Sequence, residues 1–246
     1  MNKIKLLNGN ILKILAAVFM VIDHAGLMFF PYEPIFRIIG RLAFPIFAFM
    51  ISEGARYTKN KPKYLLTISG LAFICQIVYF VFANSLYMSI LVTFTLSIIT
   101  IYALSYFKKC LFTKDSKLTE KILSGVLFVF TVLAVAFLNQ VYEIDYGFFG
   151  CMAPVFASLF DFRGLDVPKP VAMTDNLYVR LVSFGVCLLF LAYSSGGIQY
   201  YSLLSLLLLA CYSEQRGTAK MKYFFYVFYP LHLVVLTAIQ ILIYIV

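Results

Sequence analysis

Residues 11–58 read ILKILAAVFMVIDHAGLMFFPYEPIFRIIGRLAFPIFAFMISEGARYT, and the rest of the chain is organised around this stretch. Its apolar residues suffice for two membrane-spanning helices, each of which needs about 20 residues. A set of ionisable side chains interrupts the apolar sequence: Lys13, Asp23, His24, Arg41 and Glu53. Because a charged residue at membrane depth is energetically costly, this set marks a candidate functional site.

The composition is that of a membrane protein. Hydrophobic residues make up 63% of the sequence, and the mean hydropathy is +0.93, whereas a soluble domain is about 45–50% apolar. The formal net charge of +9 is explained by basic residues that flank membrane spans, so it does not call for a nucleic-acid partner. We therefore expect a multi-pass protein of the bacterial plasma (inner) membrane, with the lipid bilayer around it and no nucleic acid bound.

The cysteines and histidines do not form a metal site in the sequence. The five cysteines lie in or beside apolar runs without paired spacing, so we interpret them as buried thiols and not as a disulfide framework. Two histidines and scattered cysteines do not make a metal ligand set. Haem between the two histidines is disfavoured by the polar neighbours of His24. We expect no metal.

Long apolar runs predict about nine transmembrane helices. The expected spans are roughly 11–30, 35–55, 64–83, 86–107, 121–140, 147–160, 179–195, 197–213 and 222–246. Because backbone polar groups in lipid must be satisfied within their own segment, these runs predict an all-α, polytopic membrane helix bundle. No internal repeat divides the sequence, so we expect a single transmembrane domain over residues 1–246.

The basic residues predict the orientation of the bundle. With a cytoplasmic N-terminus, all but three of the 20 basic residues (Lys13, Arg37 and Arg41) fall in the segments on that side, which are 1–10, 56–63, 108–121, 161–180 and 214–222. The opposite loops carry acidic residues instead. By the positive-inside rule, the N-terminus is expected in the cytoplasm and the C-terminus outside.

Several polar residues of the first two spans are expected on the same helix face or at the same depth in the membrane. Lys13 and His24 are eleven residues apart, and eleven steps of 100° return to within about 20° of the start. The rise between them is about 16 Å, so Lys13 is expected near the cytoplasmic end and His24 past the midplane. Arg41 is expected about 9 Å from the outer end of the second span, close to the depth of His24. Arg37 lies one turn before Arg41 on the same face.

The second histidine, His232, lies in the last predicted span, within KYFFYVFYPLHL (222–233). We expect it near mid-depth, with Tyr229 on a similar face and Pro230 disturbing the helix beside it. A histidine in such a position either bonds to a neighbouring helix or belongs to a functional site.

Three further features have structural as well as functional interpretations. Pro45 is expected to kink the second span and to free a backbone carbonyl. Glu53 and Arg56 form an i,i+3 pair that we interpret as a structural pair at the cytoplasmic end of that span. Asp145 opens the sequence D-Y-G at the outer surface, where it is either a turn residue or part of a binding site.

Four motifs together resemble those of the TraX family. They are DHAG (23–26), GRLAFPIFAFMISEGARYT (40–58), DYGFFG (145–150) and KYFFYVFYPLHL (222–233), and they follow in the family's order along the chain. TraX-like proteins are named for the protein that acetylates the N-terminus of conjugative pilin, and the family is similar to the wider transmembrane acyltransferase superfamily. That superfamily carries a basic residue, ten further residues and a histidine in its first helix. Lys13 and His24 match this spacing, although arginine is more usual at the first position.

The resemblance implies an acetyl-CoA-dependent N- or O-acetyltransferase. Cytoplasmic acetyl-CoA would be held through its phosphates by a basic rim made of Lys13, Arg56, Lys220 and Lys222. His24 would act as general base near the thioester, because the pKa of an imidazole lies close to operating pH. Arg41 would stabilise the oxyanion, and Asp23 would either fix the tautomer of His24 or pair with Arg41.

The resemblance also implies an acceptor on the outer side of the membrane. The acceptor would be a pilin-like N-terminus, another peptide or a glycan, and it would contact four residues, Asp145, Tyr146, Tyr229 and His232. The sequence does not determine which acceptor is used, whether nitrogen or oxygen is acetylated, whether a covalent acetyl-enzyme forms, or what the oligomeric state is.

Two other functions compete with acetyl transfer. Intramembrane Asp, His, Arg and Glu also build the proton relays of proton-coupled transporters. The lack of a visible inverted repeat disfavours that alternative. A non-catalytic assembly subunit would not need buried charges at matched depth.

Overall fold

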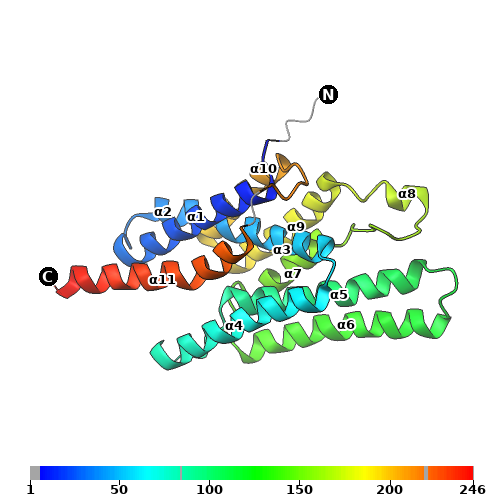
Figure 1. The fold of residues 1–246 in the computed structure, drawn as a ribbon, viewed down its shortest axis with the longest axis horizontal. Coiled ribbons are helices and arrows are strands. Elements are labelled where there is room, and N and C mark those ends of the chain that lie inside the picture. The colour runs from blue at the N-terminus through cyan, green and yellow to red at the C-terminus, as the bar shows by residue number, and fades with distance from the viewer. Residues whose placement is uncertain (1–5, 84, 219–220, 246) are drawn as a thin grey trace. The chain divides into compact units, whose positions relative to one another are not determined.

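The computed structural model describes residues 6–83, 85–218 and 221–245 (Figure 1). Within these residues the chain is helical, with two isolated β-bridges, Leu7–Tyr212 and Met88–Ile144, and no strand. The predicted all-α fold is therefore confirmed. The chain divides into two compact units, one of Met1–Met50 with Ala192–Val246 and the other of Ile51–Leu191. The single domain expected over residues 1–246 stays a prediction.

Six helical segments of the described residues are long and apolar enough to cross a membrane. They are Gly9–Phe29, Pro34–Tyr57, Lys61–Val81, Ile90–Phe112, Leu118–Val141 and Leu177–Ser195. Shorter apolar segments follow at Gly147–Ala157, Gly197–Ala210 and Val227–Ile243. The nine segments match the predicted positions, but the first two of the shorter ones fall below the roughly 20 residues that a crossing needs. The fold is that of a multi-pass membrane protein, and the count of nine crossings stays a prediction.

The unit formed by the two ends of the chain is built on α1 (Gly9–Phe29), which packs against α2 (Pro34–Gly40) and α11 (Lys222–Ile245). Figure 1 shows α11, in red, running alongside α1, in blue. Glycine permits the close approach of α1 to α2, because a Cβ on Gly26 would collide with Phe36 and one on Gly40 would collide with the Asp23 carboxylate. The site described below lies at this contact.

The beginning of α1 is fastened to the segment that leads toward α11. Asn8 caps α1 by accepting hydrogen bonds from the backbone N–H groups of Asn10 and Ile11, both at 3.0 Å. Leu7 pairs with the backbone on both sides of residue 212, and the Gly9 N–H donates to the Gln215 carbonyl at 2.7 Å. These bonds hold α1 and the 211–216 segment together.

The second predicted span is broken rather than kinked. α2 ends at Gly40 and α3 (Ala43–Tyr57) begins two residues after Arg41. Pro45 lies in the first turn of α3 and has no N–H to donate to the Arg41 carbonyl four residues earlier. The predicted effect of Pro45 is thus located at Arg41–Leu42, where the chain makes a turn.

The second unit is centred on α5 (Ile90–Phe112), which packs against α4 (Lys61–Ala83), α6 (Leu118–Val141) and α7 (Gly147–Ala157). Hydroxyl groups on α5 bind the backbone next to and within α7, because Thr93 Oγ1 donates to the Asp145 carbonyl and Ser97 Oγ to the Cys151 carbonyl, both at 2.7 Å. A short helix α8 (Lys169–Ala172) and most of α9 (Leu177–Ser195) complete the unit. The end of α9 leads into the 3₁₀ helix η1 (Gly197–Leu204) and α10 (Ser205–Ala210), which belong to the first unit.

Candidate functional site

The Asp23 carboxylate is held by the two arginines that follow α1. Arg37 Nη1 donates to Asp23 Oδ2 at 2.7 Å and lies 3.3 Å from the Asp23 carbonyl. Arg41 Nη2 lies 3.8 Å from the other carboxylate oxygen. Of the two roles considered for Asp23, pairing with Arg41 is the one that this arrangement has, and Arg37 is its closer partner. All three side chains are at most one-quarter exposed.

His24 faces the only other histidine of the chain. His232 Nε2 lies 3.3 Å from His24 Nδ1, and the ring centroids are 5.0 Å apart. Each ring also contacts its own helix, since His24 Nδ1 lies 2.9 Å from the Met20 carbonyl oxygen and His232 Nδ1 lies 3.0 Å from that of Phe228. The Tyr229 ring packs edge-on against His232 with a centroid distance of 5.8 Å. The structure therefore places His24, the expected general base, next to His232 and Tyr229, which were expected to contact the acceptor.

Gln199 joins the cluster and was missed by the sequence prediction. Arg41 Nη1 donates to Gln199 Oε1 at 3.3 Å, and Gln199 is only 4% exposed. Among the described residues, Arg41 Nε and Gln199 Nε2 are buried N–H donors without a hydrogen-bond partner. Gly196 and Gly197 both have positive φ angles, which glycine adopts without strain, and the turn they make places Gln199 at the start of η1. A side-chain amide two residues after such a glycine pair, in an otherwise apolar segment, is the signal that the sequence offers.

The charges of this cluster do not cancel. Asp23 supplies one negative charge, and Arg37 and Arg41 supply two positive ones, beside two imidazoles that are uncharged when neutral. All three charges act on His24. An excess positive charge with unpaired N–H donors suits a group that carries or develops negative charge. The cluster of Asp23, His24, Arg37, Arg41, Gln199 and His232 is named the histidine–arginine cluster below.

The predicted basic rim is described only in part. Lys13 is half-buried on α1, and because α1 is a continuous helix the predicted same-face spacing to His24 holds. Lys220 lies outside the described residues, and so does the side chain of Lys222. The guanidinium of Arg56 is engaged by two carboxylates, with Nη2 2.8 Å from Asp175 Oδ1 and Nε 3.4 Å from Asp161 Oδ1.

Glu53 and Arg56, the predicted structural pair, are not joined by a direct ion pair among the described residues. Glu53 Oε1 instead lies 2.5 Å from Arg180 Nη2, and these side chains are 5% and 0% exposed. The i,i+3 spacing places Glu53 and Arg56 on neighbouring positions of α3, but each side chain meets a partner from another segment of the unit. Sequence spacing within one helix does not reveal such partners.

Two basic residues predicted in cytoplasmic loops lie instead inside helices, where they are buried. Lys108 on α5 donates to the Ser158 and Asp161 carbonyls at 2.7 and 3.1 Å, and Arg180 Nε on α9 donates to the Ala157 carbonyl at 3.0 Å. Both cations thus satisfy carbonyls at the C-terminal end of α7, where the helix dipole is negative. With Arg56 they balance the three carboxylates of Glu53, Asp161 and Asp175, so this network has a structural explanation.

The D-Y-G sequence forms the turn that starts α7. Tyr146 and Gly147 both have φ of 60°, and the Gly147 N–H donates to the Ile144 carbonyl at 2.8 Å. Burial and the neighbouring Asp145 carboxylate, to which the phenol hydrogen-bonds, raise the pKa of Tyr87. Asp145 and Tyr146 belong to the unit Ile51–Leu191, whereas Tyr229 and His232 belong to the other. The first pair therefore has a turn-forming role, and its predicted contact with an acceptor stays a prediction.

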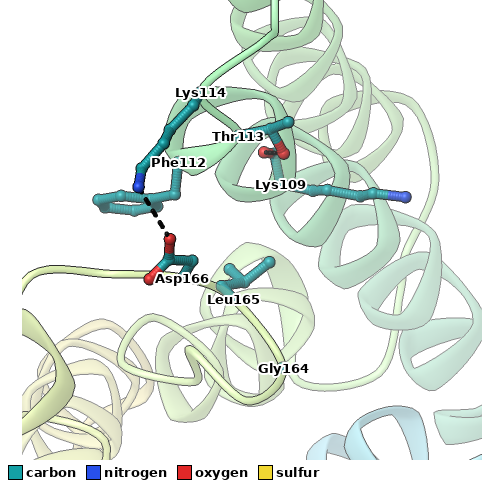
Figure 2. A pocket seen from close by; sticks show the side chains of 7 residues that line it. All are labelled: Lys109, Phe112, Thr113, Lys114, Gly164, Leu165 and Asp166. Carbon is teal, nitrogen blue, oxygen red and sulfur yellow. Dashed lines mark hydrogen bonds and ion pairs between the residues drawn. The ribbon is translucent and has the colours of Figure 1, made fainter.

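A surface cavity of about 280 Å³ lies at the end of α5 (Figure 2), lined by Lys109, Phe112, Thr113, Lys114, Gly164, Leu165 and Asp166. Figure 2 shows Lys114 reaching toward Asp166, whereas Lys109 points away from it. The Lys114–Asp166 pair is 3.6 Å apart with both side chains more than 80% exposed, so it contributes little energy. None of the predicted site residues lines this cavity. In the described part of the chain, no three His, Cys, Asp or Glu side chains are grouped as metal ligands.

Comparison with known proteins identifies the family. The family model described as TraX protein matches residues 8–240. An uncharacterized protein of Rickettsia prowazekii (strain Madrid E), RP591, is 44% identical over 61 residues, which cover 25% of this chain. The aligned part amounts to 23% of the length of that relative. No solved structure matches the chain. The match from residue 8 to residue 240, nearly the whole chain, shows that this multi-pass membrane protein belongs to the TraX family.

Proposed function

We propose that this protein transfers an acetyl group from acetyl-CoA to an amine or hydroxyl acceptor, with the histidine–arginine cluster as its active site. The observation that carries the proposal is the contact of an imidazole pair, half-buried His24 and buried His232, with an arginine cluster of net positive charge. Acyl transfer needs a base for the acceptor and a stabilising group for the oxyanion, and both occur here. Membership of the TraX family, which is named for a pilin-acetylating protein, supports this reaction class.

His24 acts as the general base. It removes a proton from the acceptor N–H or O–H while the acceptor atom attacks the thioester carbonyl carbon. The resulting tetrahedral intermediate collapses by breaking the carbon–sulfur bond, and the proton held on His24 passes to the departing thiolate. The acceptor is acetylated, the thiol of CoA is restored, and His24 returns to its neutral form.

Arg41 and Gln199 stabilise the oxyanion of the intermediate. Both offer a buried N–H that has no partner among the described residues, and the net charge beside them is positive. Arg37 keeps the Asp23 carboxylate paired at 2.7 Å, so that this carboxylate does not compete for the remaining donors of Arg41. Donors fixed before the reaction need no reorganisation when the charge develops.

Gln199→Leu is expected to lower kcat for acetyl transfer by about 10²–10³-fold, the usual effect of removing one oxyanion donor. Gln199→Glu is expected to be equally impaired, because its carboxylate pairs with Arg41 and offers no N–H. Steady-state transfer in proteoliposomes measures both. Gln140→Leu, at an exposed amide on α6, is the matched control. Full activity in Gln199→Leu would remove Gln199 from the mechanism.

The donor enters from the cytoplasmic side, on the proposed orientation with the N-terminus in the cytoplasm and the C-terminus outside. Lys13, Lys220 and Lys222 hold the phosphates of acetyl-CoA as point charges. Arg56 is a weaker candidate than the sequence indicated, because two aspartates already engage its guanidinium. The acceptor approaches from the outer side of the plasma (inner) membrane.

Binding of acetyl-CoA to the purified protein in nanodiscs tests the proposal. Saturable binding is expected in the wild-type protein and in His24→Ala, and a loss of affinity is expected in Lys13→Ala because a phosphate contact is removed. A Lys13→Arg variant, which keeps the charge, is expected to retain binding. Absence of binding to folded wild-type protein, together with proton flux in sealed vesicles, would favour a proton-coupled transporter instead.

A further inference from the structure

We infer that His232 is a positioning residue for His24: it fixes the tautomer in which His24 Nε2 is unprotonated and supports the charge that His24 acquires. The catalytic part of this role rests on the proposed acetyl transfer. The tautomer itself follows from hydrogen-bond geometry alone, so the two parts are separately testable. No other histidine exists in the chain to take either place.

The tautomer of His232 follows from its contact with its own helix. Its Nδ1 lies 3.0 Å from the Phe228 carbonyl oxygen. A carbonyl oxygen only accepts, so Nδ1 carries the proton. In a neutral imidazole the other nitrogen then has a lone pair and no hydrogen, which makes His232 Nε2 an acceptor. The Phe228 ring stacks on the His232 ring with an interplanar angle of 11° and a centroid distance of 5.2 Å, and this contact holds the ring plane in place.

The same reasoning fixes His24. Its Nδ1 lies 2.9 Å from the Met20 carbonyl oxygen, so this nitrogen is also protonated. The Nδ1–H group is shared between that carbonyl and the lone pair of His232 Nε2, which lies 3.3 Å away. With both rings neutral, placing either proton on Nε2 would leave a lone pair facing a carbonyl oxygen. Two Nδ1–H tautomers are therefore the neutral arrangement that satisfies all three contacts.

This assignment leaves His24 Nε2 as the basic atom. Among the described residues it has no hydrogen-bond partner, and the His24 side chain is half-buried rather than enclosed. When Nε2 takes a proton from the acceptor, the ring becomes an imidazolium and its Nδ1–H becomes a charged donor. His232 Nε2 accepts that hydrogen bond, and charge-assisted bonds are roughly twice as strong as neutral ones.

His232 thus occupies the place that a carboxylate takes in a serine-type triad. Asp23 adjoins His24 in sequence but is paired with Arg37 and Arg41. The charged groups that act on His24 are one carboxylate and two arginines, so the cluster already has a net positive charge. His232 is a neutral partner and adds no further charge. The pair requires α1 and α11 to pack side by side, as they do in this unit.

Nuclear magnetic resonance of the full-length protein labelled with ¹⁵N-histidine tests the tautomers directly, because two rings give an unambiguous spectrum. In nanodiscs above the range in which histidine titrates, both rings are expected as Nδ1–H tautomers. A ¹⁵N–¹⁵N coupling across the hydrogen bond is expected between His24 Nδ1 and His232 Nε2. An Nε2–H tautomer on His24, or two uncoupled rings, would overturn the inference whether or not the protein is active.

Two substitutions of His232 test its role in transfer. His232→Phe keeps an aromatic ring against Phe228 but removes the acceptor, and it is expected to lower kcat about 10–100-fold with unchanged acetyl-CoA affinity. His232→Gln offers an amide oxygen near the lost Nε2 and is expected to recover most of this loss. Equal impairment of both variants would mean a merely structural role, and unimpaired transfer in His232→Phe would mean none. If wild-type protein shows the coupled tautomers but transfers no acetyl group, the proposed function fails while the pair stands.

Discussion

His24→Asn is expected to lower kcat for acetyl transfer by about 10²–10⁴-fold, the range that general-base catalysis contributes. The asparagine amide can still donate to the Met20 carbonyl, which His24 Nδ1 contacts at 2.9 Å, but it has no basic nitrogen. The variant is therefore expected to fold and to bind acetyl-CoA like the wild-type protein. Transfer rates measured in proteoliposomes, next to calorimetric binding of acetyl-CoA, separate the loss of chemistry from the loss of binding.

Leu27→Ala is the matched control for this measurement, because Leu27 lies on the same helix with an exposed side chain. It is expected to transfer acetyl groups at the wild-type rate. Full transfer activity in a folded His24→Asn protein would assign the base to another residue. Loss of acetyl-CoA binding in that variant would instead give His24 a part in holding the donor.

Arg180→Met is expected to destabilise the protein by about 3–5 kcal/mol, the effect of removing one partner of a buried ion pair. The substitution leaves the Glu53 carboxylate buried without its partner at 2.5 Å and also removes the hydrogen bond to the Ala157 carbonyl. Thermal unfolding in detergent, followed by circular dichroism, measures the change. Glu53→Leu in the Arg180→Met background is expected to recover much of the stability, because an apolar pair of similar volume often replaces a buried ion pair without loss.

The exposed pair at the surface cavity provides the control for this second prediction. Lys114 and Asp166 are 3.6 Å apart and almost fully exposed, so Lys114→Met is expected to change stability by less than about 1 kcal/mol. An Arg180→Met protein as stable as the wild type would show that Glu53 is solvated or protonated in the native state. The same two measurements thus separate a buried structural network from a surface ion pair.

The buried network also affects how the distribution of basic residues predicts the orientation in the membrane. Lys108 and Arg180 were counted as cytoplasmic basic residues because of their position in the sequence. In the structure both are buried and hydrogen-bonded within the unit Ile51–Leu191, so they are not the loop charges that the positive-inside rule counts. Lys114 and Arg163 instead lie in turns with exposed side chains, so they are the basic residues that we expect at the cytoplasmic surface. A labelling experiment with cysteines introduced at Lys114 and at Glu143 would decide the sidedness, with Lys114 expected on the cytoplasmic side.

The sequence by itself determined the helical fold, the positions of the segments, the family and the shared face of Lys13 and His24. Hydropathy and helical periodicity are local properties, so they can be read along one segment at a time. The turn at Arg41–Leu42 also follows locally from the missing N–H of Pro45.

Tertiary structure alone decided which polar side chains meet. His24 and His232 are 208 residues apart, Arg41 and Gln199 are 158 apart, and Glu53 and Arg180 are 127 apart. No spacing rule connects such residues, because their contacts depend on which helix faces pack together. The sequence therefore identified His24, Asp23 and Arg41 as special, but the packing of each unit determined that Asp23 pairs with arginines, that His24 bonds to His232, and that Glu53 bonds to Arg180.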